Sequence, residues 1–349
     1  MKSMGVDVIV LRLRIFLNVA LLFCISSFGL NSCAKQPTKP EEETGKWEAI
    51  NSGLESLYVQ CITISPHDKD VMYAGTYGGI FRTTNGGILW YKHSSGLTSD
   101  DIKAVAVSPH NANIVFCGTW GQGVFKSEDG GETWVQKSDG IPNPRINSIA
   151  FDPNDPQTVY IACADKMLKT INAGENWEVS FTYGNVRSVA VHPTEENRIY
   201  VGIEYHGIFR TDSTGNGWER VNNGLYHTND GYLGPYDITF DPNSPETMYV
   251  ATYSVDVHKS VDGGDVWTLK SNGIDYRKVR KSVINPINPR ILYAATDRGV
   301  MMSTDGGENW STLSGGLENE KIRTIALHRD GPEMVYAGTY GGGIFRYVK

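Results

Sequence analysis

The chain has 349 residues, of which 40% are hydrophobic, and a formal net charge of −7 from 32 basic and 39 acidic residues. This length and apolar content allow a folded domain with a large core. The acidic balance argues against a nucleic-acid-binding protein, because such binding depends on neutralising phosphates. The spacing of His and Cys shows no CxxC or clustered pattern, so no metal and no cofactor is expected.

Residues 1–32 form a predicted export signal. A basic start (Lys2, Arg12 and Arg14) precedes an uncharged apolar run, Ile15 to Leu30, which is short for a membrane-spanning helix. The run leads into Leu-Asn-Ser-Cys, ending at Cys33, which resembles the processing site of bacterial lipoproteins. The resemblance implies that Cys33 is lipidated and becomes the mature N-terminus. The alternative is an ordinary signal peptide cut nearby.

Residues 33–46 follow the signal and read as a flexible tether, because Lys35 to Lys46 contain no large apolar residue. By resemblance to Gram-negative lipoproteins, Ala34 after the cysteine favours the outer membrane. We therefore expect a lipid-anchored protein of the cell envelope, facing either the periplasm or the cell surface. Without residues 1–32 the chain keeps 29 basic and 38 acidic residues, a net charge of −9.

The mature chain has an odd number of cysteines. Cys24 and Cys33 belong to the signal, whereas Cys61, Cys117 and Cys163 lie inside strand-like runs. We expect these three to be buried small hydrophobic residues and not a disulfide framework.

Seven tryptophans recur at steps of 41 to 49 residues, and they are Trp47, Trp90, Trp134, Trp177, Trp218, Trp267 and Trp310. A period in the forties with one aromatic per unit is typical of a β-propeller. The unit that begins at Ser148 reads as four short strands in a meander. The sequence therefore predicts an all-β fold, a single seven-bladed β-propeller of four-stranded blades spanning residues 47–349.

The two ends of the repeat region are incomplete in complementary ways. The last unit stops after three strand-like runs, and Trp47 to Ile50 is a lone fourth strand with no unit before it. Pairing this N-terminal strand into the C-terminal blade would close the ring and hide the exposed edges. We therefore predict such a closure.

A turn of fixed chemistry precedes six of the tryptophans, as in SEDGGETW from Ser127 to Trp134. An Asp or Asn accepts hydrogen bonds from amides of its own turn, the glycines adopt positive φ, and the tryptophan packs beneath. Recurrence around the ring argues for a structural role and against catalytic carboxylates. The residues concerned are Asn85, Asp129, Asn172, Asp262 and Asp305.

These turns resemble the Asp-box of BNR repeats, the neuraminidase-type repeats. The phrases YAGTYGGIFRTTNGG (Tyr73 to Gly87) and YAGTYGGGIFR (Tyr336 to Arg346) resemble three groups of propellers. They are the photosystem II stability and assembly factor group, sortilin-type receptors and xyloglucan-cleaving glucanases. The first resemblance implies a factor that assembles or stabilises an envelope complex, with a basic patch on the channel face.

The innermost strands of a propeller line its channel. Aligning the units gives one residue just before each predicted first strand: Gln60, Lys103, Asn147, Arg187, Tyr236, Arg280 and Arg323. Four of the seven are cationic, which would focus positive potential at the channel mouth. We predict a funnel that binds anions or carboxylates. The alternative is that these cations pair with nearby acids such as Asp101, Asp237 and Glu320.

The loops between second and third strands share this face. Aromatic residues there can stack on sugars or hold peptide side chains. Trp120 is the strongest candidate because it is additional to the seven-membered ladder, while Tyr77 and Tyr340 read as packing residues. The insertion Thr228 to Tyr236 breaks the period of one unit. The loop residues are Tyr77, Trp120, Asp165, Glu204, Tyr205, His206, Tyr253, Asp297, Arg298 and Tyr340.

A glycosidase needs two carboxylates across one bond. The xyloglucanase resemblance implies an acid in a T-D-x-G-G loop, but Tyr77 occupies that place in the first unit, and only Asp297 is kept. Motifs for a serine nucleophile, a phosphate loop or HExxH are absent. We therefore predict a non-catalytic, monomeric binder of a protein partner or an extended anionic ligand. The alternatives are a carbohydrate-active protein using Asp297, Asp165 and Glu204, and a purely structural module.

Overall fold

The structure is a computed structural model that describes residues 45–213, 215–225, 234–253, 256–275, 278–313, 315–317, 320–328 and 331–349. The predicted signal, Cys33 and nearly all of the tether lie outside this range, as does most of the insertion Thr228 to Tyr236. The described residues contain 28 strands and no helix, and so include none long and apolar enough to cross a membrane.

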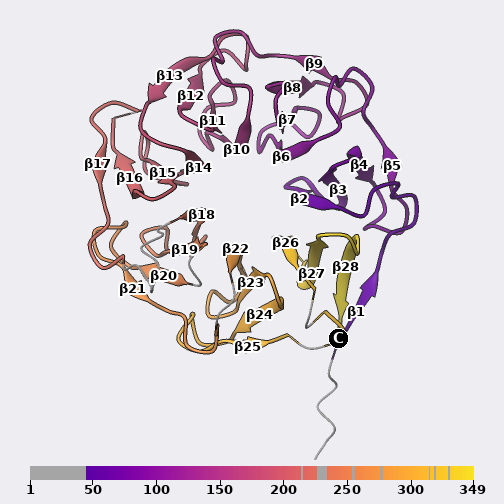
Figure 1. The fold of residues 1–349 in the computed structure, drawn as a ribbon, viewed down its shortest axis with the longest axis vertical. Helices are drawn as coiled ribbons and strands as arrows, with labels where there is room; N and C mark the ends of the chain where they lie inside the picture. Colours follow the sequence, from indigo (N-terminus) through magenta and orange to yellow (C-terminus); the bar gives the residue numbers. More distant parts are fainter. Residues whose placement is uncertain are drawn as a thin grey trace, which may run out of the picture. The chain divides into compact units, whose positions relative to one another are not determined.

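The strands form seven antiparallel four-stranded sheets, arranged as blades around a ring (Figure 1). The innermost strands are β2 (Val59–Ser65), β6 (Ile102–Val107), β10 (Ile146–Phe151), β14 (Val186–Val191), β18 (Pro235–Phe240), β22 (Val279–Ile284) and β26 (Ile322–His328). The second strands are β3 (Asp68–Thr76), β7 (Val115–Thr119), β11 (Val159–Cys163), β15 (Ile199–Ile203), β19 (Met248–Thr252), β23 (Leu292–Thr296) and β27 (Gly331–Thr339).

The third strands are β4 (Gly79–Thr83), β8 (Val124–Ser127), β12 (Met167–Thr170), β16 (Gly207–Thr211), β20 (Val257–Ser260), β24 (Gly299–Ser303) and β28 (Ile344–Val348). The outermost strands are β5 (Tyr91–Lys92), β9 (Val135–Gln136), β13 (Glu178–Phe181), β17 (Glu219–Arg220), β21 (Thr268–Leu269), β25 (Ser311–Thr312) and β1 (Lys46–Ala49). We number the blades 1 to 7 in the order of their innermost strands, so that β2 begins blade 1 and β26 begins blade 7. The predicted fold is confirmed.

The hydrophobic core lies between neighbouring blades. The second strands of blades 2 to 6 are buried along their whole length, which agrees with their continuous apolar sequences. One core cluster joins Phe116 of blade 2 to Trp177 of blade 3, and their rings meet edge to face. Each blade therefore buries its faces against its two neighbours.

The N-terminal strand closes the ring as predicted. β1 pairs with β28, with Trp47 opposite Tyr347, and the Trp47 indole Nε1 donates to the Leu313 carbonyl, 3.3 Å away. The strand spans Lys46–Ala49. Lys46, which the sequence places in the tether, therefore belongs to the propeller.

The outer turns are structural units held by repeated hydrogen bonds between their side chains and their own amides. In blade 2 the Asp129 carboxylate accepts from the Thr133 amide and the Ser127 hydroxyl, while Ser127 Oγ accepts the Gly131 amide. Asn85, Asn172, Asp262 and Asp305 make the corresponding contacts. All seven ladder tryptophans donate their indole N–H to a carbonyl of the preceding blade.

The three described cysteines are free thiols, which agrees with the prediction of no disulfide among them. Cys117 and Cys163 are fully buried. Cys61 is only half-buried and lines the channel cavity. Its predicted burial is therefore wrong in part, because it lies on an innermost strand.

Candidate ligand-binding site at the channel mouth

Every innermost strand carries a β-bulge at the same position. The pairing with the second strand skips one residue in each blade, for example Arg280 between Val279 and Lys281. A bulge adds a residue to one strand of a pair and re-aims its side chain. The seven skipped residues are Gln60, Lys103, Asn147, Arg187, Tyr236, Arg280 and Arg323. The prediction that they precede the strands is wrong: each is the second residue of its strand.

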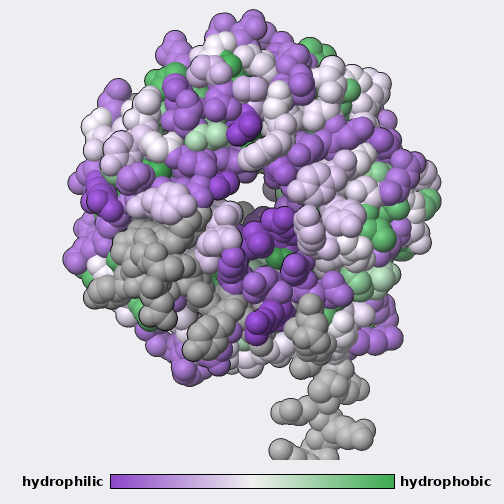
Figure 2. All heavy atoms as spheres, viewed as in Figure 1, coloured by the Kyte–Doolittle hydropathy of each residue, from purple (hydrophilic) through white to green (hydrophobic). Residues whose placement is uncertain are grey.

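All seven bulge residues line one cavity of about 400 Å³ in the channel. Figure 2 shows an opening at the centre of the ring with strongly hydrophilic residues at its edge. The cavity lining contains one carboxylate, Asp237, against five cations, which are Lys103, Arg187, Arg280, Lys281 and Arg323. A protein of net negative charge thus places an excess of positive charge in its channel.

Two of the five cations are neutralised. Lys103 Nζ lies 3.1 Å from the Asp101 carboxylate and donates to Gln60 at 2.6 Å. Arg187 Nε donates to Glu204 at 2.9 Å, and Asn185 donates to the same carboxylate. Pairing with Asp101 agrees with the predicted alternative. Glu204, which the sequence offered as an acid, instead serves as the partner of Arg187.

Arg280, Lys281 and Arg323 form no ion pair with any described residue. Asp237 accepts hydrogen bonds from the Ser282 amide at 3.1 Å and from the Thr239 hydroxyl at 2.8 Å. Burial raises the pKa of Asp237, and Lys281 lowers it. Burial lowers the pKa of Arg280, and the neighbouring charge of Arg323 lowers it further. The predicted pairing of the cations with Asp237 and Glu320 is therefore not formed within the described chain.

Aromatic rings hold several cations in place at the rim. Lys103 Nζ lies 4.9 Å from the ring centre of Trp120 and 4.8 Å from that of Tyr77, and Arg323 lies 4.7 Å from that of Tyr340. Arg187 lies over Tyr236 at 5.5 Å. A cation–π contact orients a cation without cancelling its charge. These rings therefore support anion binding.

The rim is a continuous aromatic arc over blades 7, 1 and 2. Tyr58 contacts both Tyr340 and Tyr77 edge to face, and Trp120 follows across Lys103. All four rings are exposed, Trp120 at 42%. Tyr77 and Tyr340, which read as packing residues in the sequence, therefore lie at the surface of the channel mouth.

Tyr253 stacks on the cavity residue Tyr236 with ring centres 5.5 Å apart, whereas Tyr205, His206 and Arg298 lie outside the cavity lining. Tyr205 is exposed and adopts φ of 67°, and His206 packs against Tyr183 with ring centres 4.7 Å apart. The amide of Arg298 donates to the Thr296 hydroxyl. The structure thus brings Lys103, Arg187, Tyr236, Arg280, Arg323 and Trp120 together, but not Tyr205, His206 or Arg298.

The three candidate catalytic acids do not line the cavity, and each contacts its own blade. Asp165 pairs with Lys166 at 2.7 Å, Glu204 with Arg187, and Asp297 accepts the Lys278 amide at 3.2 Å. A glycosidase pair needs one carboxyl group kept protonated opposite an ionised one. The cavity offers only Asp237. Within the described ranges no group of His, Cys, Asp and Glu could hold a metal ion.

Sequence reasoning missed Lys281 and Thr324 as cavity residues, and Tyr58 and Arg145 at the rim. Lys281 and Thr324 directly follow bulge residues in β22 and β26 and line the same cavity. Arg145 lies over Trp120 at 5.2 Å. Strict alternation would turn Lys281 and Thr324 away from the channel, so only a recognised bulge could have revealed them.

No family model matches the chain. Among curated proteins, the oligoxyloglucan-reducing end-specific xyloglucanase of Emericella nidulans is 28% identical over 68 residues, which is 20% of this chain and 8% of that enzyme. The short match spans much less of the enzyme than a whole domain, so its activity does not transfer.

Solved structures share the fold. A GH74 xyloglucanase from Xanthomonas campestris superposes with a TM-score of 0.71 and 17% identity, covering 86% of this chain and 53% of that one. YCF48, solved bound to D1 peptide, superposes with a TM-score of 0.67 and 17% identity, covering 87% of this chain and 97% of that one. The predicted resemblance to assembly-factor and xyloglucanase propellers is confirmed at the level of the fold.

Proposed function

We propose that this chain is a non-catalytic binding protein that holds an acidic segment of a protein partner at the channel mouth. The observation that carries the proposal is the group of three cations, Arg280, Lys281 and Arg323, which line the cavity and form no ion pair with a described acid. The three cations are half-buried and therefore only partly hydrated, and a ligand carboxylate would form charge-assisted hydrogen bonds with them. The ligand seen on YCF48, a peptide, supports the choice of a protein partner.

The test is affinity capture from native envelope extract, with bound proteins identified by mass spectrometry. Arg280→Glu/Arg323→Glu is compared with wild type and with Lys69→Glu/Lys349→Glu, which makes the same charge change at residues outside the cavity lining. We expect a partner that wild type and the control retain and the channel variant loses, with unchanged melting temperatures. A partner retained equally by all three proteins would contradict the proposal.

The membrane anchor is a separate part of the proposal. We propose that Cys33 carries a lipid and that the propeller is held at the outer membrane by the tether. The support is the sequence around Cys33 alone. Cys33→Ala should move the protein from the membrane fraction to the soluble fraction after lysis, and an unchanged distribution would contradict the anchor.

Glycan binding is the second candidate function, favoured by the exposed aromatic arc of Tyr340, Tyr58, Tyr77 and Trp120. Against it, Lys103 and Arg145 lie over Trp120, and Arg323 lies over Tyr340, so these rings already hold cations. A glycan array would show binding that Trp120→Ala abolishes. Release of sugar that stops in Asp297→Asn would instead identify a hydrolase.

A further inference from the structure

Two donors in the cavity wall have no partner. Arg280 Nε and Thr324 Oγ1 are shielded from bulk water and form no hydrogen bond with any described residue. Both residues line the channel cavity. Buried polar groups in native proteins are hydrogen-bonded with few exceptions, and each exception costs about 1–3 kcal/mol. The two groups therefore need an acceptor that the described residues do not supply.

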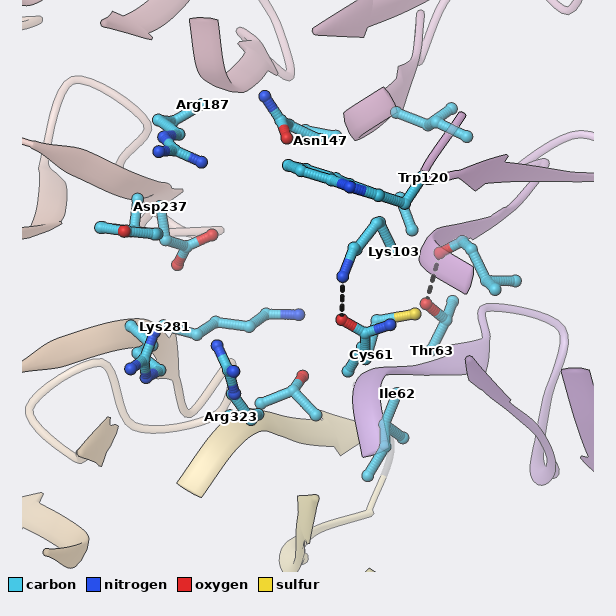
Figure 3. A pocket seen from close by; sticks show the side chains of 18 residues that line it. Cys61, Ile62, Thr63, Lys103, Trp120, Asn147, Arg187, Asp237, Lys281 and Arg323 are labelled. Atoms are coloured by element: carbon cyan, nitrogen blue, oxygen red, sulfur yellow. Dashed lines mark hydrogen bonds between the residues drawn. The ribbon is translucent and has the colours of Figure 1, made fainter. Parts of the chain in front are cut away.

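The two donors come from the innermost strands of two neighbouring blades, one from a bulge residue and the other from the residue that follows a bulge. Arg280 and Lys281 occupy the second and third positions of β22, and Arg323 and Thr324 occupy the same positions of β26. The Thr324 methyl group lies over Gly338, where a Cβ atom would not fit, so the hydroxyl is directed away from that glycine. In Figure 3 the side chain of Lys281 extends into the cavity toward Lys103, with Arg323 beside it.

The charges around Arg280, Lys281 and Arg323 are not balanced. Arg280 and Arg323 repel each other, and the lining carboxylate, Asp237, already accepts two hydrogen bonds from its surroundings. Asp297 attracts Arg280 from outside the cavity lining, but three cations against one lining carboxylate still leave an excess of positive charge between blades 6 and 7. An anion seated there would be attracted by all three cations and would meet donors that have no other acceptor.

We propose that Arg280, Lys281, Arg323 and Thr324 form a subsite for a single carboxylate group between blades 6 and 7. The inference rests on the proposed function and names the ligand group that this function requires. A carboxylate has two oxygens, which match the two unpartnered donors, and it is flat, as the guanidinium fork requires. Phosphate would be attracted by the same cations, so it is tested below as a competing ligand.

The test is calorimetric titration of the purified propeller with matched short peptides. One carries a free C-terminus, one is amidated and neutral, and one is amidated with a single glutamate; inorganic phosphate is the fourth ligand. We expect binding of at least one carboxylate peptide, and the peptide that binds identifies the source of the carboxylate. Equal binding of the neutral peptide, tighter binding of phosphate, or binding of none would overturn the subsite.

Two variants separate binding from folding. Arg323→Gln should weaken carboxylate binding about tenfold or more, the usual loss for a hydrogen bond to a charged group. Thr324→Val keeps the shape and removes the unpartnered hydroxyl, so it should raise the melting temperature of the free protein and lower the carboxylate affinity. Lys69→Gln, at the start of β3 and outside the cavity lining, is the control. An unchanged affinity in Thr324→Val would contradict the assignment.

The subsite and the proposed function can fail independently. Carboxylate binding without capture of any partner would keep the subsite and remove the function. Capture of a partner by a propeller that binds no carboxylate peptide would keep the function and remove the subsite.

Discussion

The outer turns and the inner bulges recur with the same period, but they differ in how their polar groups are satisfied. In the outer turn of blade 2, the Asp129 carboxylate and the Ser127 hydroxyl are fully engaged, and other blades repeat the same bonds. At the inner bulges the backbone repeats while the side chains vary, and Arg280 Nε is left without a partner among the described residues. The outer turns repeat the same hydrogen bonds and hold the ring together. The bulge side chains vary from blade to blade and include groups without a partner, and these are available to a ligand.

Removing the closing strand should have the largest effect. A protein lacking residues 1–49 loses β1, its pairing with β28 and the buried Trp47. Loss of a buried tryptophan side chain alone costs about 3–5 kcal/mol, and the exposed edge of β28 adds to this. We expect the free energy of unfolding, measured in urea by circular dichroism, to fall by more than the loss expected for the tryptophan alone. A protein lacking residues 1–44 is the control, and equal midpoints for the two would contradict the closure.

Two tryptophans of the same size sharpen the comparison. Trp134 belongs to the outer ladder and is 3% exposed, whereas Trp120 stands on the inner rim at 42% exposed. Trp134→Ala should cost about 3–5 kcal/mol. Trp120→Ala should cost clearly less, because less of its apolar surface is buried, but it should weaken ligand binding at the channel mouth. Similar losses of stability in urea titrations would show that Trp120 is a core residue.

His258 breaks the pattern of the third strands. It is fully buried where other blades have Phe81, Phe125, Leu168 or Met301, and neither ring nitrogen has a partner among the described residues. Burial lowers its pKa to about 4. The folded state thus binds its proton less readily than the unfolded state, and stability is lost as pH falls from 6.5 to 4.

The expected loss over that interval is up to about 3 kcal/mol, at 1.36 kcal/mol for each pH unit. His258→Leu introduces the residue type that blade 3 has at this position. It should remove the pH dependence of the stability, and it should stabilise the protein near neutral pH because it removes an unsatisfied imidazole. Melting curves of both proteins from pH 7 to pH 4 provide the measurement. Parallel curves over that range would show that folding does not lower the pKa of His258.

The sequence predicted the parts of the fold that are carried by many equivalent residues. Seven tryptophans and six similar turns fix the number of blades, and the unmatched strand at Trp47 fixes the closure. The bulges were not predictable in the same way, because residues as different as Gln60, Asn147 and Tyr236 occupy them. A backbone irregularity that accepts any side chain leaves no compositional signal.

The site was predictable only in outline for a related reason. The bulge cations were found by aligning units, but the alignment could not say which of them are neutralised. Arg187 lies in the first strand of its blade, and Glu204, 17 residues later, lies in the loop after the second strand. They meet because the bulge turns Arg187 toward that loop. Lys281 escaped detection because an alternating strand would point it elsewhere.

The smallest predicted effect concerns a single outer turn. Asp129→Ala removes the acceptor for the Thr133 amide and the Ser127 hydroxyl, and should cost about 1 kcal/mol because the turn is exposed to solvent. Hydrogen bonds from Thr133 and Ser127 lower the pKa of Asp129 to about 2. Its contribution is therefore present above pH 3.8 and is lost as pH falls toward 2, below the interval in which His258 titrates.

Asp129→Asn is the matched variant, because Asn85 and Asn172 already fill this position in blades 1 and 3 and accept the corresponding amides. It should keep nearly all of the stability at neutral pH and lose the dependence between pH 4 and pH 2. Urea titrations at both pH values distinguish the two variants. If Asp129→Ala also weakened carboxylate binding, the outer turn would be coupled to the channel, and the division between supporting and ligand-binding positions would not hold.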